Sequence, residues 1–339
     1  MALASPEAYF DRYGLRPSSP EIDLGIQPLG YPSGVISALM QRDRILNKTL
    51  TSSKQPQKMH AFLRGADMLA LLADKRLEAG LLGDMPSILA ASAGNVYIVG
   101  LVKQASTAIV AKGDLQVNGL AGKRIGYVEA SSAHHTLLQG LSSAGIKESE
   151  VKLIPMGISD MPDALARGDI DAFSAWEPAP TIAMSKNAQI HIVFRGVSTD
   201  YFVIERDFAN RAPQTALHLV AAFVRTIDWM RRSSRNTDKA IRWAMADALK
   251  FSGKPSQLSV AQIAAIMHRE ILDIPSAPVI LNDPRTPTLQ KEFQFLHHLG
   301  KLPASAKWEN VQSALRYDGL AKVLAEPRTF QIQIDDYED

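Results

Sequence analysis

Short apolar segments alternate with amphipathic and polar segments over most of the chain. The short runs have the length of strands, and the segments with helical periodicity have the length of helices. In the N-terminal part this pattern predicts strands at 22–27, 59–63, 78–82 and 96–102, helices at about 35–44 and 66–74, and a helix opening at 84–86. Residues 1–20 are polar with three prolines, which predicts an arm, and the polar residues 47–58 predict a long exposed loop.

The central part of the chain repeats this alternation. It predicts strands at 123–128, 151–154, 170–174 and 190–194, helices at 134–144 and 161–167, and a helix beginning near 176–178. Gly145 is expected to cap the first of these helices. A further strand is predicted at 201–204, and most of the chain beyond 207 reads as helical, at 215–231, 238–249, 260–270 and 289–299. The proline-rich residues 271–288 predict an extended wrap, and the tail from Ala325 has no clear role.

Alternating strands and helices predict an α/β protein with mainly parallel sheets and helices on both faces. Two segments of this pattern, 66–86 and 159–179, are faint copies at a constant offset of 93. The residues Asp67, Met68, Leu72, Ala73 and Ala79 recur as Asp160, Met161, Leu165, Ala166 and Ala172. Related units in one chain predict two similar lobes with a cleft between them.

The lobes are expected to be discontinuous in the sequence. Residues 105–198 form lobe II, and residues 1–104 and 199–339 form lobe I, which carries the N-terminal arm and the C-terminal helices. Connecting strands near 106–110 and 197–203 would act as a two-strand hinge. The two copies end at Asp84 and at Glu177, so we expect those loops to face each other across the cleft.

Composition narrows the class of function. The net charge is +2, from 37 basic and 35 acidic residues, and this balance disfavours nucleic acid as a partner. The chain has no cysteine, which excludes thiol catalysis, disulfides, zinc–thiolate sites and iron–sulfur clusters. No apolar run reaches 18 residues, and the N-terminus does not read as a signal peptide. The protein is therefore either cytoplasmic or the mature part of an exported chain behind a new Met.

Candidate binding residues lie in loops that follow strands and open helices. Unpaired N–H groups and a partial positive charge make helix N-termini suited to anions, and ligands bind beyond the carboxyl ends of parallel strands. Four such loops are 27–34, 83–86, 129–134 and 176–178. They supply the candidates Gln27, Tyr31, Ser33, Gly34, Gly83, Asp84, Ser131, Ser132, His134, Trp176 and Glu177, to which Arg64 is added as a neutraliser of an anionic group.

Each candidate also has a purely structural interpretation. Gln27–Gly34 can be an ordinary turn, Asp84 and the serines can cap helices, and Trp176 can fill the core. His134 and Arg64 can simply be solvated, as can Lys103, a weaker candidate for the same role as Arg64. Dinucleotide, P-loop, zincin and serine-hydrolase motifs are absent, and the adjacent His134-His135 and His297-His298 are poor chelates. We therefore predict no catalytic residue, no metal and no cofactor.

Three segments resemble a known family: GLLGDMP (80–86), GKRIGYVEASSAHHTLLQGLSSAGI (122–146) and ALARGDIDAFSAWEPAPTIA (164–183). They are similar to periplasmic substrate-binding proteins of ABC importers for sulfonates, taurine, nitrate and related anions, over about residues 22–250. The resemblance implies a two-lobed, type II-like periplasmic-binding-protein fold that closes on its ligand. It also implies a periplasmic monomer, a membrane permease as partner, and an anionic ligand end held near Ser33, Ser131 and Ser132, with Trp176 close by.

Two departures from this family are the polar 47–58 segment and the missing export signal. Related enzymes on this scaffold, the thiamine-pyrimidine synthases and sulfinate desulfinases, depend on cysteine, which this chain lacks. A cysteine-independent enzyme acting on a small anionic metabolite remains an alternative. The effector domain of a regulator is disfavoured, since no helix-turn-helix segment precedes the first lobe.

Overall fold

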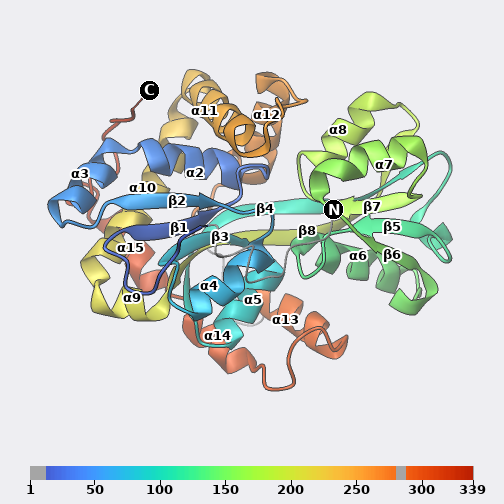
Figure 1. Ribbon diagram of the computed structural model, residues 1–339, viewed down its shortest axis with the longest axis horizontal. Coiled ribbons are helices and arrows are strands. Elements are labelled where there is room, and N and C mark those ends of the chain that lie inside the picture. The colour runs from blue at the N-terminus through green and yellow to red at the C-terminus, as the bar shows by residue number, and fades with distance from the viewer. Residues whose placement is uncertain (1–12, 280–287, 339) are drawn as a thin grey trace.

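The computed structural model describes residues 13–279 and 288–338. Its centre is one eight-stranded sheet with the order β2-β1-β3-β8-β4-β7-β5-β6 (Figure 1). The strands are β1 (Ile22–Ile26), β2 (Gln57–Ala61), β3 (Ala79–Gly83), β4 (Val96–Lys112), β5 (Arg124–Tyr127), β6 (Lys152–Pro155), β7 (Ala172–Ala175) and β8 (Ile190–Glu205). The predicted α/β class is confirmed.

The sheet consists of two parallel groups joined by an antiparallel centre. Strand β1 pairs in parallel with β2 and β3, and β5 pairs in parallel with β6 and β7. The long strands β4 and β8 pair with each other in antiparallel fashion, and β3 and β7 flank them, also antiparallel. We call β2-β1-β3 the first half of the sheet and β7-β5-β6 the second half.

Helices cover both faces of the sheet. They are α2 (Ser33–Arg42), α3 (Arg44–Ser52), α4 (Leu69–Ala73), α5 (Asp84–Ser92), α6 (Ser132–Ser143), α7 (Met161–Arg167), α8 (Ala179–Lys186), α9 (Arg206–Arg211), α10 (Pro213–Arg232), α11 (Ser234–Ser252), α12 (Val260–Met267), α13 (Thr288–His298), α14 (Trp308–Ala314) and α15 (Tyr317–Ala325). In Figure 1, α2, α11, α12, α7 and α8 lie above the sheet, and α4, α5, α6, α13 and α14 lie below it.

The repeat seen in the sequence is a repeat of structure. Each copy begins with a 3-10 turn, Gly65–Met68 or Ile158–Asp160, and continues through a short helix into a buried strand, β3 or β7. Gly25 in β1 and Gly126 in β5 occupy matching places, because a side chain at either would collide with a methionine of the following crossover. The two methionines, Met68 and Met156, are not repeat partners, so the halves share the order of elements and a close approach at this glycine rather than the same contacting residue.

Several sequence predictions need correction. Residues 47–58 are not a long loop: α3 covers 47–52 and β2 begins at Gln57. The N-terminus of α3 is capped by the Asp43 carboxylate, and Leu46 and Leu50 are buried one turn apart. The strands predicted at 96–102, 190–194 and 201–204 belong to the much longer β4 and β8. Helix α12 ends at Met267 and a π-helical turn follows. Residues 1–12 of the predicted 1–20 arm and residues 280–287 of the predicted 271–288 wrap lie outside the described residues.

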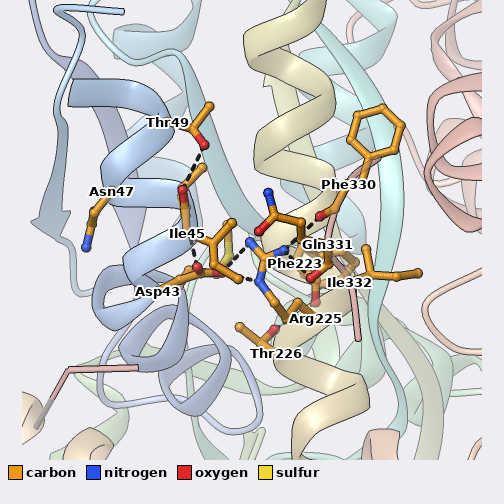
Figure 2. Close-up of polar contacts among 12 residues, drawn as sticks. Asp43, Ile45, Asn47, Thr49, Phe223, Arg225, Thr226, Phe330, Gln331 and Ile332 are labelled. Atoms are coloured by element: carbon orange, nitrogen blue, oxygen red, sulfur yellow. Dashed lines mark hydrogen bonds and ion pairs between the residues drawn. The ribbon is translucent and has the colours of Figure 1, made fainter. Parts of the chain in front are cut away.

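The C-terminal tail, for which the sequence suggested no role, is tied to the body through one buried arginine. Arg225 in α10 bonds the Asp43 carboxylate, with Nη2–Oδ2 at 2.7 Å and Nε–Oδ2 at 2.8 Å. Its Nη1 donates to the carbonyl oxygens of Phe330 and Gln331 at 3.0 and 3.1 Å. Figure 2 shows the guanidinium between the start of α3 and the tail. We call this cluster the Arg225 clamp.

Candidate functional site

The carboxyl ends of the two parallel groups point toward each other. Strand β3 runs in the same direction as β4 and ends where Gly83 pairs with Asp200, which in turn pairs with Lys103 of β4. Strand β7 runs against β4 and ends where Ala175 pairs with Ala108. Both strands therefore stop at the middle of β4, one from each side, and the loops that follow them meet at this junction. This is the place where α/β sheets bind ligands.

The first and fourth candidate loops contact each other directly. The Tyr31 backbone N–H donates to the Glu177 carbonyl oxygen at 3.2 Å. Gly30 lies against the Trp176 indole, so that a Cβ added to Gly30 would be 3.2 Å from Trp176 Nε1. These loops open α2 and α8, so two helix N-termini converge on one side of the sheet.

The second and third candidate loops meet in the same way. A Cβ at Gly83 would clash with Ser132 Oγ, and the Asp84 Oδ2 atom lies 3.0 Å from His135 Nδ1. These loops open α5 and α6. The expectation that the Asp84 and Glu177 loops face each other is wrong. The Asp84 loop of the first half contacts the 129–134 loop of the second half, and the Glu177 loop of the second half contacts the 27–34 loop of the first half.

Several candidate side chains already have structural partners. Ser131 Oγ donates to the Val128 carbonyl at 2.6 Å and accepts from His134 N–H at 3.4 Å, so this hydroxyl caps α6. Ser33 Oγ donates to the Gly30 carbonyl at 3.4 Å. The space that a side chain at Gly34 would fill is taken by the Pro28 carbonyl oxygen, 2.8 Å from an added Cβ. That glycine serves backbone packing.

Three other candidates are likewise engaged. Gln27 Nε2 donates to the Leu81 carbonyl at 3.0 Å and joins the ends of β1 and β3. Arg64 bonds Asp67 at 3.0 Å through Nε and at 2.5 Å through Nη2. His134 is buried, 3.4 Å from Glu148, and burial lowers its pKa although Glu148 opposes the shift.

A buried lysine provides positive charge at the junction. Lys103 Nζ lies 3.6 Å from Asp200 Oδ2, and the side chain is 2% exposed. Burial lowers the Lys103 pKa, but the charges of Asp200, Glu270 and Asp84 outweigh this and raise it above its usual value. The lysine is therefore charged at neutral pH. The only sign of Lys103 in the sequence was a basic residue directly after the apolar strand predicted at 96–102.

A second charge cluster ties Glu177 to the helical region beyond β8. Arg269 Nη2 donates to Glu177 Oε1 at 2.9 Å and to Glu270 Oε1 at 3.0 Å. Burial raises the pKa of Glu270 to about 7, against the attraction of Lys103 and Arg269. Sequence reasoning missed both residues, because they lie in a helical segment with no local sign that it reaches the junction.

An open cleft of about 180 Å³ adjoins the first and fourth loops. Its walls come from the first loop, from the starts of α7 and α8, and from the segment between α11 and α12; they include Leu29, Tyr31, Ile158, Asp160, Pro162, Pro178, Ile182, Lys254 and Ser256. Of the candidates from the sequence, Tyr31 lines it. Burial raises the pKa of the Tyr31 phenol, and a hydrogen bond with Ser256 opposes this shift.

The junction has the geometry of the sites at which α/β folds hold small molecules between facing loops. The model of the NMT1-like family matches residues 65–245, which contain both copies of the repeat, and the chain belongs to this family. In the described residues, the helices are all too short or too polar to cross a membrane.

Relatives of the chain are named for binding taurine or aliphatic sulfonates. The taurine-binding periplasmic protein of Escherichia coli is 27% identical over 72% of this chain and 78% of its own length. A putative aliphatic sulfonates-binding protein of the same organism is 25% identical over 63% of this chain and 69% of its own. The alkanesulfonate-binding protein SsuA of Xanthomonas axonopodis pv. citri, solved with MOPS bound, superimposes with a TM-score of 0.69 at 19% identity, covering 89% of this chain and all of that one.

These comparisons agree with the resemblance seen in the sequence. The two relatives are named for taurine and aliphatic sulfonates, and the similar solved structures include an alkanesulfonate-binding protein and a periplasmic nitrate-binding protein. The predicted family and fold are thereby confirmed.

Proposed function

We propose that this protein is the solute receptor of an ABC import system and captures a small organic anion, a sulfonate, sulfate ester or carboxylate, between its two halves. The observation that carries the proposal is the convergence of the N-termini of α2, α5, α6 and α8 on one junction. Helix starts attract negative charge. Lys103 lies at the same junction, where it faces the Asp200 carboxylate at 3.6 Å. The names of the relatives point the same way.

The structure refines which candidates would touch the anion. Ser132 is the serine whose hydroxyl is not occupied in capping α6, and it sits where α5 and α6 approach. Tyr31 and Trp176 would enclose the organic part of the ligand, because aromatic rings bury much area at little entropic cost. We leave Asp84 out of the anion contacts, since a buried carboxylate repels an anion.

Closure would occur by bending β4 and β8. We place lobe I at 1–104 and 199–339 and lobe II at 105–198, so that only these two strands join the lobes. The β4–β8 pairing shifts register between Ile98 and Gly100, between Leu101 and Lys103, and between Ile109 and Val110, which supports bending on both sides of the junction. We interpret the contacts between facing loops as those of a closed form.

The test is a thermal-shift and calorimetry screen of alkanesulfonates, taurine, sulfate esters, carboxylates and nitrate. A true ligand at a hundredfold excess over its dissociation constant should stabilise the protein by about 2.7 kcal/mol. Ser132→Ala should weaken binding of that ligand without unfolding the protein. Ser143→Ala, at the other end of α6, is the matched control and should bind normally.

Two results would contradict the proposal. One is the absence of stabilisation by every anion in the screen, and the other is unchanged affinity in Ser132→Ala. The proposal also includes release of the ligand unaltered, to a membrane permease, by a monomer in the periplasm. Mass spectrometry of recovered ligand tests the first point, and a changed mass would favour the enzyme alternative.

A further inference from the structure

Three buried side chains from separate elements gather below the junction. They are Asp84 at the start of α5, His135 in α6 and Glu292 in α13, and one potential donor atom of each lies within 4.8 Å of the other two. Asp84 and His135 have fully buried side chains, and Glu292 is 5% exposed. Helix α13 also touches α6 through Phe295, whose ring centroid lies 5.6 Å from that of His135. Glu292 and Phe295, three residues apart, therefore share one face of α13.

The three side chains hold more acceptors than the described residues can satisfy. Glu292 Oε2 accepts from Thr199 Oγ1 at 3.4 Å, but Glu292 Oε1 has no hydrogen-bond partner within the described part of the chain. The neighbouring Asp200 also has an oxygen, Oδ1, with no such partner there. Asp84, Asp200 and Glu292 bring three carboxyl groups to this region. Lys103 carries one positive charge and faces Asp200. Buried charges without a counter-charge are costly, so a cation fits this position.

The donor chemistry selects the kind of cation. One imidazole nitrogen with carboxylate oxygens suits first-row divalent ions, whereas Mg²⁺ and Ca²⁺ prefer oxygen alone. Zinc bound to such donors lies about 2.0–2.2 Å from each, which places donor atoms about 3.4 Å apart. The Asp84 Oδ2–His135 Nδ1 separation of 3.0 Å is already close to this. The Gln139 side-chain nitrogen lies 3.1 Å from His135 Nε2. An ion on Nδ1 would leave the proton on Nε2, so the Gln139 amide must then turn its oxygen toward the ring to accept it.

We propose that Asp84, His135 and Glu292 bind one divalent first-row transition-metal ion, with Zn²⁺ as its representative, on the α5–α6–α13 side of the junction. The ion would join α5, which follows the first half of the sheet, to α6, which follows the second half, and would hold α13 across both. This metal site is separate from the anion proposal, because an anion can be titrated against metal-free and metal-loaded protein alike.

The test begins with the full chain stripped by a chelator and then titrated with Zn²⁺ by calorimetry. We expect one ion per chain and a higher melting temperature in the loaded protein. Glu292→Gln keeps the shape of the side chain but removes its charge. Loss of a residue that only supports a metal ligand weakens metal binding by up to about a hundredfold, so loss of this direct ligand should weaken Zn²⁺ binding by about that much or more. The matched control is Glu148→Gln, which alters another histidine–glutamate contact, that of His134, and should leave Zn²⁺ affinity unchanged.

A second control and a second measurement make the outcome decisive. His297 and His298 are exposed and could each hold adventitious zinc weakly, although adjacent histidines form a poor chelate. Replacing both with Gln should therefore leave the calorimetric titration unchanged. X-ray absorption of zinc-loaded wild-type protein requires no variant, and should show a single imidazole among oxygen ligands. Absence of one-to-one binding, full affinity in Glu292→Gln, loss of binding without His297 and His298, or two or more imidazoles at the zinc would each overturn the proposal.

Discussion

Glu270 is the buried carboxyl group beneath the Arg269–Glu177 contact, and its ionisation is opposed by its surroundings. Its side chain is 2% exposed, and Oε2 has no hydrogen-bond partner in the described residues. Burial raises its pKa from 4.5 to about 7, so ionised Glu270 destabilises the folded chain at neutral pH.

The stability of the protein should therefore depend on pH through this residue. Because the folded-state pKa lies above the unfolded one, the favourable contribution is complete below pH 4.5 and is lost as pH rises through about 7. The loss amounts to about 3 kcal/mol of unfolding free energy. Glu270→Gln should remove it and be the more stable protein at pH 8, as measured by urea unfolding from pH 4.5 to 8.

The exposed Glu309→Gln is the control and should leave the pH profile of the wild type unchanged. A Glu270→Gln profile parallel to the wild type would show that this carboxyl does not titrate in that range. Glu78, whose pKa burial also raises to about 7, adds its own slope to both profiles, so the difference between them isolates Glu270.

Features that depend on residues close together in the chain, such as helix capping, could be predicted from the sequence. Ser131 and Ser132 before a helix predicted an N-terminus there, because capping involves neighbours within one turn. The sequence did not predict Glu292, since Thr199, which it contacts, is distant in the chain and no local pattern encodes that contact. It also could not separate the serine that caps α6 from the serine that faces Gly83.

At the scale of elements, the approach of α5 to α6 depends on the missing side chain of Gly83. Its backbone has φ −66° and ψ 173°, which any residue adopts, so alanine at this position meets only the clash with Ser132 Oγ. Gly83→Ala should destabilise the closed arrangement by about 1–3 kcal/mol, as overpacking does. Small-angle scattering should show a larger radius of gyration.

The rescue variant distinguishes this mechanism from general damage. Gly83→Ala combined with Ser132→Ala removes the colliding hydroxyl and should return the radius of gyration toward that of the wild type. A radius unchanged in the single variant would mean that the halves do not need this close approach.

Helices and strands were predicted correctly where the hydrophobic pattern had clear start and end signals. They were missed or shortened where polar residues interrupted that pattern. Helix α7 was predicted with its observed bounds, because Pro162, Leu165 and Gly168 mark its start, face and end. Helix α3 has only Leu46 and Leu50 as buried contacts among polar residues, so its sequence resembled a loop. Strands β4 and β8 were underestimated because Gln104, Thr107 and similar polar residues interrupt their apolar runs at the junction.

At the scale of the whole molecule, the Arg225 clamp connects α3, α10 and the C-terminal tail. Arg225 is 2% exposed and Asp43 is fully buried. Burial raises the pKa of Asp43 although Arg225 opposes the shift. Such a pair is costly to break, because the remaining charge stays buried without a partner.

Asp43→Asn should lower the free energy of unfolding by about 3–5 kcal/mol, because it leaves the Arg225 charge without its carboxylate. Urea unfolding measures this loss. The exposed pair Arg316–Asp318 provides the comparison, and Asp318→Asn should cost less than about 1 kcal/mol. Equal losses in the two variants would contradict a special role for the clamp.

The insertion of the second half of the sheet between β4 and β8 has a consequence for biosynthesis. Strands β5, β6 and β7 form one unbroken stretch of chain, whereas β3 acquires its neighbour β8 only after that stretch has been made. Domains of a nascent chain fold as units in the order in which they emerge. We therefore expect β5, β6 and β7 to pair with one another before β3 can pair with β8. The first half of the sheet would be completed only after β8, α10 and the tail bonded by Arg225 have been synthesised.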